Sequence, residues 1–310
     1  MMMNSTQLSY FTLAAYFNTG DLKYFYFMVI FLLYIFIVSA NVFLIVVICM
    51  NRSLHEPMYL FLCSLFVNEL YGSTGLFPFL LLQILSDIHT VSKAFCFLQI
   101  YCVHLYGAVE YLNLAVMSYD RYLAICYPLQ YNTQMTSKKI GTLIAVTWLY
   151  PCFAMVIMLY LTASLQLCGN IIDKVFCVTH SVVKLGCSDT LLVNVYGLFL
   201  SFGTIFVALN VILYTYLHIL RVCFSGSKQT RQKAVSTCTP HLASLLNFSV
   251  GASFELLQSR FDMSRLPNML RIFLSLYFLT CPPLFNPVMY GLNMSKIRAV
   301  SKSLLSNVGY

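Results

Sequence analysis

An acid and a base stand side by side at Asp120 and Arg121, within the stretch from Met117 to Cys126. They close a long apolar run that begins near Cys96 and carries almost no charge. In a helix, Arg121 would lie about 37 Å from Cys96, which is about the thickness of a bilayer. If Cys96 lies at one membrane face, the charged pair therefore lies at the other. Neighbouring groups can hold such a pair in one state of the protein and release it in another.

Two more carboxylates, Glu69 and Glu110, lie deep inside apolar stretches. In helical geometry Glu69 lies about 18 Å from the start of its stretch and Glu110 about 21 Å from Cys96, and Asn41 and Asn286 have similar depths. Carboxylates in hydrocarbon are costly and almost always face the interior of a helix bundle. Two that lie close together either share a proton or bind a cation. The sequence predicts a sodium- or proton-linked site, with a fixed hydrogen-bond network that exchanges no ion as the alternative.

The composition indicates an integral membrane protein. Of the 310 residues, 60% are hydrophobic and only 9% are charged, whereas a soluble domain carries about 25% charged residues. Mean hydropathy is +0.79, and several apolar stretches exceed the roughly 18 residues that a membrane span requires. The first 23 residues lack the pattern of a cleavable signal peptide, so we expect the first span to direct insertion.

The apolar stretches predict an all-α membrane protein, a bundle of seven transmembrane helices. We expect an outer tail over residues 1–24, the transmembrane domain over 25–291 with an outer loop at 164–190, and an inner tail over 292–310. Basic and apolar residues alternate from Asn293 to Leu305, which is typical of a short amphipathic helix on a membrane surface. The absence of an internal repeat disfavours transporter folds built from duplicated halves. The expected spans are 25–50, 58–84, 95–127, 140–163, 191–222, 232–258 and 268–291.

The distribution of charge predicts the orientation of the chain. Seven spans place the two termini on opposite sides of the membrane. Eleven of the 18 basic residues then fall on the side of the C-terminus, together with two acids, Glu56 and Asp120. The positive-inside rule makes this side cytosolic and the N-terminus extracellular, in the plasma membrane, and the basicity requires no nucleic acid. The eleven are Arg52, Arg121, Lys138, Lys139, Arg221, Lys228, Arg231, Lys233, Lys296, Arg298 and Lys302.

Covalent modification is expected on the outer side. Asn4-Ser5-Thr6 fits the N-glycosylation pattern, with a chance match as the alternative. Four of the 12 cysteines fall at or beyond the outer face, where disulfides form, and four cysteines permit three pairings. These are Cys96, Cys168, Cys177 and Cys187. The other cysteines are expected to be buried thiols rather than metal ligands.

Two motifs carry a resemblance to rhodopsin-like G-protein-coupled receptors. Asp120-Arg121-Tyr122 at the inner end of the third span resembles the Asp-Arg-Tyr motif of that family. Asn286-Pro287-Val288-Met289-Tyr290 resembles its Asn-Pro-x-x-Tyr motif in the seventh span. Either motif alone is weak, but their spans, order and sidedness together are specific.

Further stretches narrow the resemblance to vertebrate odorant receptors, over about residues 25–305. The signature-like stretches are Pro57-Met58-Tyr59, Ser118–Cys126, Lys233–His241 and Pro283–Pro287. The stretch from Leu65 to Gly72 resembles fish-type odorant receptors. The chain departs from the family at Val178, where an acid is frequent, at Val235, where an aromatic residue is usual, and at Pro240.

The resemblance implies a receptor that binds a small organic odorant on its outer side and activates a heterotrimeric G protein of the stimulatory, olfactory type. In such a receptor Asp120 would hold Arg121 at rest. If the sixth span swings outward, Arg121 would meet the C-terminal helix of the G protein, together with Tyr216 and Lys233. Pro287 would break the helical ladder and let Tyr290 change direction.

The resemblance also assigns the cysteines and the buried acids. Cys96 and Cys177 match the disulfide of the family, and Cys168 with Cys187 could form a second bridge, so that the outer loop becomes a lid over the bundle. Asn41, Glu69, Glu110 and Asn286 match the positions of a sodium pocket, in which Glu69 stands where most of the family has Asp.

The odorant cavity is expected between the outer halves of spans three, five, six and seven. Candidate wall residues on span three follow three- and four-residue spacing, and those on span six lie in its outer part. His104 would donate to the ligand or make an interhelical hydrogen bond instead. Arg260 would pair with a carboxylate odorant, with Asp262 or with a lipid phosphate, and Glu255 is not assigned to the wall. The candidates are Val103, His104, Gly107, Ala108, Tyr111, Gly251, Leu256 and Arg260.

Other function classes fit the sequence less well. A cation channel or transporter could use Glu69 and Glu110, but no polar path continues through the Leu- and Phe-rich spans. A non-olfactory rhodopsin-like receptor for an amine would need an acid in the outer part of span three, where Val103 stands. An enzyme is disfavoured because the histidines show no spacing for a metal or a nucleophile.

Overall fold

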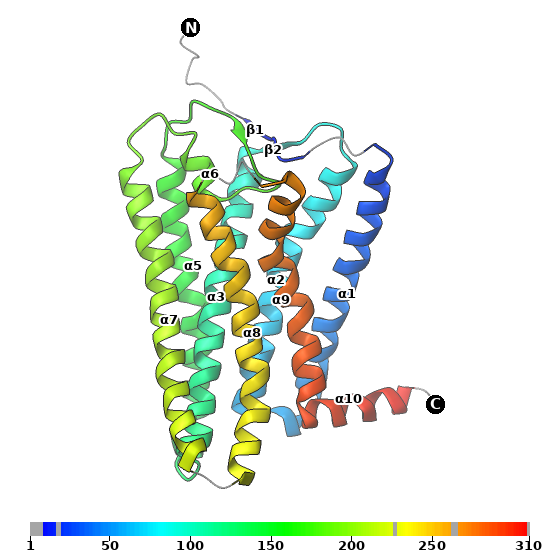
Figure 1. Ribbon diagram of the computed structural model, residues 1–310, viewed down its shortest axis with the longest axis vertical. Helices are drawn as coiled ribbons and strands as arrows, with labels where there is room; N and C mark the ends of the chain where they lie inside the picture. The colour runs from blue at the N-terminus through cyan, green and yellow to red at the C-terminus, as the bar shows by residue number, and fades with distance from the viewer. Residues whose placement is uncertain (1–8, 17–19, 226–227, 262–265, 309–310) are drawn as a thin grey trace.

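Seven long helices run side by side through the protein (Figure 1), as the sequence predicts. The computed structural model describes residues 9–16, 20–225, 228–261 and 266–308. The helices are α1 (Leu22–Met50), α2 (Pro57–Leu85), α3 (Lys93–Cys126), α5 (Ser137–Ala163), α7 (Leu191–Ser225), α8 (Lys228–Arg260) and α9 (Asn268–Asn293). Only the backbone is described for Lys228, Thr230, Lys233, Ser236, Thr237, Ser259, Arg260, Asn268 and residues 305–308.

Local signals explain where several of these helices begin. Pro57 opens α2 at a position where its missing N–H costs nothing. The hydroxyl of Ser92 accepts a hydrogen bond from the Phe95 amide at 3.3 Å and so caps α3. Thr136 caps α5 in the same way, accepting from the Lys139 amide at 3.3 Å. These caps start α3 and α5 two and three residues before the expected spans.

Six of the described helices are long and apolar enough to cross a membrane, and α8 is the long helix that is not among them. Its polar residues nevertheless point inward: His241 and Ser244 are buried. Its large exposed apolar side chains recur at helical spacing, at Val235, Leu242, Leu246, Val250 and Leu257. The helix therefore presents an apolar stripe outward and buries His241 and Ser244 inside the bundle, which is how a polar helix can occupy a membrane.

A small sheet covers the end of the bundle that carries the disulfides. It joins β1 (Tyr10–Leu13) to β2 (Thr90–Ser92) in antiparallel pairing and to β3 (Ile171–Ile172) in parallel pairing. Phe11 and Leu13 of β1 are buried beneath it. The sequence predicts only a plain tail here, because β1 has no local signal and forms through pairing with segments far along the chain. Short helices complete the loops: η1 (Arg52–Leu54), α4 (Tyr131–Gln134) and α6 (Thr179–Val183).

The opposite end of the bundle carries α10 (Ser295–Val308), which runs across the helices instead of along them (Figure 1). Ile297 is buried against the bundle, and Val300 and Leu304 pack beside it. Lys296 on the exposed face pairs with Glu56 at 2.5 Å. The expected amphipathic helix is therefore present, with one face on the protein and basic side chains on the other.

Gly251 marks the tightest approach of α8 to α9. A Cβ at this position would lie 2.7 Å from the Phe278 Cβ and 2.9 Å from its Cα. A backbone atom cannot yield as the end of a flexible side chain can, so a larger residue would push the two helices apart.

We expect Gly251→Ala to lower the free energy of unfolding by about 1–3 kcal/mol, because the added methyl overpacks the α8–α9 contact. The measurement is the midpoint of thermal unfolding of the purified protein in detergent. Gly203→Ala is the matched control, since a Cβ there meets nothing within 4 Å. Equal midpoints for the two variants would contradict the packing role of Gly251.

Candidate functional site

Several of the functional groups predicted from the sequence lie on α3, at different depths in the bundle. Cys96 lies at one end of this helix, Glu110 near its middle, and Asp120 and Arg121 at the other end. The helix is buried among its neighbours on most of its faces, so each group meets a different set of helices.

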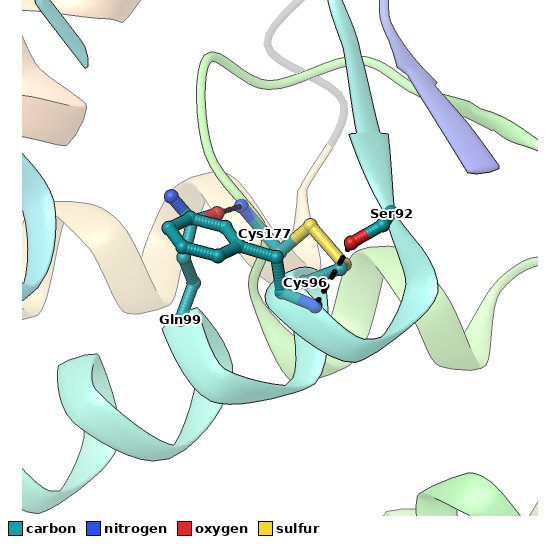
Figure 2. Close-up of a disulfide and its surroundings, with 5 residues drawn as sticks. Ser92, Cys96, Gln99 and Cys177 are labelled. Carbon is teal, nitrogen blue, oxygen red and sulfur yellow. Dashed lines mark hydrogen bonds between the residues drawn. A yellow bond between two sulfur atoms is a disulfide. The ribbon is translucent and has the colours of Figure 1, made fainter. Parts of the chain in front are cut away.

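Two disulfides fix the outer loop at one end of the bundle. Cys96 bonds Cys177 and Cys168 bonds Cys187, the pairing that the family resemblance implies. Figure 2 shows how the loop is also held by a hydrogen bond, in which the Cys177 amide donates to Gln99 Oε1 at 3.2 Å. Gln99 lies on α3 one turn after Cys96. The loop is thus tied to α3 at two adjacent points and forms the predicted lid.

A cavity of about 180 Å³ lies beneath this lid. Its described wall comes from α3, α5, α6, α7, α8 and α9, and most of the wall is apolar. All five residues expected on span three line it, as does Leu256 of α8. Those five are Val103, His104, Gly107, Ala108 and Tyr111. The volume is below the roughly 300–1,000 Å³ of sites for drug-sized ligands, so the cavity suits a small molecule.

The other two candidates are placed differently. Gly251 is not among the described residues of the wall, because it faces Phe278 and Tyr277 of α9 in close packing. The side chain of Arg260 lies outside the described residues, so its expected pairing with a carboxylate stays a prediction.

The polar groups of the wall are the part that sequence reasoning missed. They include Thr179 and His180 of the lid, Asn194, Ser201 and Thr204 of α7, and Glu255 of α8. His104 Nδ1 lies 2.9 Å from the Ile100 carbonyl, to which it donates. Its Nε2 then accepts from the Thr179 hydroxyl at 3.4 Å. His104 therefore makes an interhelical hydrogen bond to α6 of the lid, which was one of its two expected roles, and its donation to a ligand stays a prediction.

The two buried acids meet at mid-bundle. Asn286 of α9 donates through Nδ2 to Glu69 of α2 and, at 3.3 Å, to Glu110 of α3. Asn68 of α2 donates to the second oxygen of Glu110 at 2.9 Å. All four side chains are fully buried. One amide thus bridges two carboxylates from different helices, which ties α2, α3 and α9 together.

Several oxygens of this cluster have no hydrogen-bond partner within the described part of the chain. These are Glu69 Oε2, Asn68 Oδ1 and Asn286 Oδ1. Hard cations take carboxylate and carbonyl oxygens as ligands, so this donor set fits a sodium ion. Asn41, the fourth residue expected in the sodium pocket, lies on α1. Its Nδ2 donates to the Ile37 and Pro283 carbonyls, and it makes no hydrogen bond to either acid among the described residues.

The charged pair closes the Arg121 end of α3. Arg121 pairs with Asp120 at 2.9 Å, and the Asp120 side chain is fully buried. Tyr131 of α4 donates to the other Asp120 oxygen at 2.6 Å. Burial and then the Asp120 carboxylate raise the pKa of Tyr131, so this hydroxyl keeps the proton that it donates. Tyr122 turns the other way and packs against Tyr127 and Tyr214.

A second polar link joins α3, α7 and α8 nearby. His241 Nε2 donates to the Leu114 carbonyl at 2.8 Å, which leaves Nδ1 to accept from the Tyr216 hydroxyl at 2.8 Å. His241 belongs to a signature-like stretch in the sequence, but its partners could not be read there. Tyr216 is buried in this arrangement, so its expected contact with a G protein requires a rearrangement of these helices.

The seventh-span motif lies beside this link. Pro287 is one of three prolines inside α9, and Tyr290 is buried with its ring edge-on to Phe66 of α2. Asn286 of the same motif belongs to the acid cluster. Asn4 and the side chain of Lys233 lie outside the described residues, so glycosylation and the Lys233 contact stay predictions.

Comparison with known proteins decides the family. Residues 30–308 match the family model described as olfactory receptor. The chain is 33% identical to the human olfactory receptor 10A3 over 293 residues, which cover 93% of this chain and 91% of the relative. It is 33% identical to the human olfactory receptor 11A1 over 300 residues, covering 95% and 93%. The mouse olfactory receptor 4B13 is 31% identical over 268 residues, 86% of each chain.

The chain belongs to the olfactory receptor family. Its fold matches the crystal structure of squid rhodopsin with a TM-score of 0.75 at 15% sequence identity, covering 94% of this chain and 88% of that one. The predicted seven-helix receptor fold is therefore confirmed, and the receptor is a multi-pass membrane protein. As an olfactory receptor it is an odorant-activated G-protein-coupled receptor and not an enzyme. The fish-type resemblance stays a prediction.

We expect Gly107→Leu to weaken the response to any agonist at least tenfold, because the added side chain fills the cavity. A Cβ at Gly107 has its nearest neighbour, Phe248 Cζ, at 4.0 Å, so the backbone needs no shift. The measurement is agonist potency in transfected cells at matched surface expression. Gly141→Leu is the control, because it adds the same side chain at an open position outside the cavity. An unchanged potency for Gly107→Leu would show that agonists do not bind in this cavity.

Proposed function

We propose that a small organic odorant binds in the cavity beneath the lid and that binding releases Arg121 to activate a stimulatory G protein. The observation that carries this proposal is the placement of both sites on the same two helices. α3 and α8 line the cavity at the disulfide end and hold the polar links at the Arg121 end. A displacement of α8 at the cavity can therefore be transmitted along these helices to the Asp120–Arg121 pair, which we call the switch.

The odorant acts by preferring one arrangement of the helices. It shifts the equilibrium only by the difference of its affinities for the resting and active arrangements. Phe248, Ala252, Glu255 and Leu256 of α8 line the cavity, so a ligand contacts the helix that has to move. Those contacts are where the difference in affinity arises.

Movement at the other end requires two polar links to change. α8 leaves α3 only if His241 gives up the Leu114 carbonyl, and Tyr216 then loses its acceptor. Arg121 becomes available to a partner only when it leaves Asp120. Tyr131 donates to Asp120 throughout, so the carboxylate keeps one hydrogen bond when Arg121 departs. The freed guanidinium offers five donors to the G protein.

We place the N-terminus outside the cell and the C-terminus in the cytosol. Basic residues gather at the Arg121 end of the bundle, which by the positive-inside rule faces the cytosol. The basic face of α10 lies at the same end and suits contact with anionic lipid headgroups. In this orientation the lid and cavity face the odorant and Arg121 faces the G protein.

We further propose that the acid cluster binds sodium in the resting receptor. A cation between Glu69 and Glu110 would use the oxygens that lack partners among the described residues. Its ligands would be Glu69 Oε2 and the amide oxygens of Asn68 and Asn286, while Glu110, whose two oxygens already accept from Asn68 and Asn286, adds the second negative charge. An ion that prefers this packing of α2, α3 and α9 stabilises it against rearrangement.

A cyclic-AMP reporter in transfected cells tests the switch. With an odorant panel of acids, amines, alcohols and steroids, we expect at least one agonist for the wild type. Arg121→Ala should abolish the response, because it removes the group that meets the G protein. Asp120→Asn should raise signalling without agonist, since it removes the charge that holds Arg121.

Surface expression of each variant is the control for folding. A wild-type receptor that reaches the surface and answers nothing in the panel would count against the proposal. So would an Arg121→Ala variant that signals normally.

Sodium binding is tested by thermal unfolding of the purified receptor in sodium chloride and in choline chloride. At ten times the dissociation constant, a bound ion adds about 1.4 kcal/mol of stability, so the midpoint should rise with sodium. Glu110→Gln should remove the dependence on sodium because it deletes one charge of the site. Identical curves in the two salts would leave a fixed hydrogen-bond network as the explanation.

A further inference from the structure

An ion pair joins the lid to the wall of the cavity. Lys174, which follows β3 in the outer loop, lies 2.6 Å from Glu255 of α8. Both side chains are almost completely covered, with 12% and 13% of their surfaces exposed. Glu255 lines the cavity, whereas Lys174 is not among its described wall residues. The pair therefore presents its acidic member to a ligand.

The hydrogen-bonding capacity of Lys174 is already used. Its ammonium group has three protons to donate. It reaches Glu255 Oε1 at 2.6 Å, Gln258 Oε1 at 3.1 Å and Ser275 Oγ at 3.5 Å. A ligand acceptor could bind Lys174 only by displacing one of these groups.

Glu255, in contrast, has a carboxylate oxygen that can still accept a hydrogen bond. Its Oε2 is buried and has no hydrogen-bond partner among the described residues. The hydroxyl of the neighbouring Ser275 has a single proton, and in this arrangement it donates that proton to Gln258 Oε1 at 2.7 Å. A buried carboxylate oxygen without a donor is costly, so a ligand that supplies a donor gains the free energy of that hydrogen bond.

Charge decides which donor fits. Lys174 and Glu255 neutralise each other, so the polar end of the wall has no net charge from these two groups. A carboxylate ligand would meet Glu255 as a like charge, and an ammonium ligand would add an unbalanced positive charge beside Lys174. A neutral hydroxyl donates one proton and adds no charge. The rest of the wall is mostly apolar, which matches a hydrocarbon body.

We propose that the cavity selects small alcohols, whose hydroxyl donates to Glu255 Oε2 while the hydrocarbon body packs between α3 and α7. This inference rests on the proposed function and adds the class of ligand to it. Lys174 acts as the positioning group, since it holds Oε1 and leaves Oε2 for the ligand.

The test compares ligands that share one chain length and differ in the headgroup. The probes are hexan-1-ol, 1-methoxyhexane, hexylamine and hexanoic acid, applied to cells that express the wild type. We expect hexan-1-ol to be at least tenfold more potent than the other three. The ether is the matched control, because it keeps the hexyl chain and the oxygen but carries a methyl group in place of the hydroxyl proton.

A change in selectivity separates recognition from a merely structural role. Glu255→Gln should weaken the response to hexan-1-ol at least tenfold. The same variant leaves Lys174 without its counter-charge, so hexanoic acid should become an agonist. The double variant Lys174→Met/Glu255→Gln should lose the response to the acid again at equal surface expression. A variant that only damages the fold would gain no agonist.

The outcomes distinguish this inference from the function on which it rests. A wild type that answers hexylamine or hexanoic acid better than hexan-1-ol overturns the alcohol class and leaves the odorant receptor intact. A wild type that answers the broad odorant panel but not hexan-1-ol overturns it too. Silence toward every probe and the whole panel counts against the proposed function itself. If Glu255→Gln fails to reach the surface, the responses of the wild type to the four probes still decide whether the cavity selects alcohols.

Discussion

The rest of the structure depends on the need to pair polar groups that lie in hydrocarbon. Asn286 donates to both Glu69 and Glu110, and Asn68 donates to Glu110, so three helices share one buried network. No water in a bilayer core can replace these hydrogen bonds, and each helix is therefore held in rotation and depth by its partners. α8 obeys the same rule, because His241 and Ser244 are buried in the bundle and its apolar stripe faces out. The cavity and the switch lie on either side of this network.

The buried network of Glu69, Glu110 and Asn286 thus lies between two functional ends of the bundle, the lid with its cavity and the Asp120–Arg121 pair. The disulfides and Gln99 hold the lid on α3 at one end, and Asp120 holds Arg121 at the other. α8 is attached to α3 near the switch by the His241 hydrogen bond and meets the cavity through its outer half. It is also bound to the lid through Lys174 and Glu255. A ligand that alters its packing therefore acts on the most polar helix of the bundle, whose contacts with α3 are few and specific.

The sequence predicts those features that depend on local pattern. Helical spacing places Val103, Gly107 and Tyr111 on one face, and all three line the cavity. Features that depend on distant partners were not predictable. β1 forms only by pairing with β2 and β3. The acceptors of Lys174 lie on α8 and α9, and the partners of His241 lie on α3 and α7. The sequence predicts Gly251 in the wall, but Gly251 packs against α9, because the inward face of α8 cannot be recognised from hydrophobicity when buried positions are polar.

The central claim is that an odorant in the cavity moves the inner end of α8 away from the other helices. The most direct measurement is the distance between spin labels at Lys138 of α5 and Val235 of α8, two exposed positions at the Arg121 end. It is made on the receptor in nanodiscs with and without the agonist from the reporter assay. The account predicts a longer distance with agonist, and the same longer distance without agonist in Asp120→Asn. A distance that stays unchanged while the same sample activates its G protein would contradict the account.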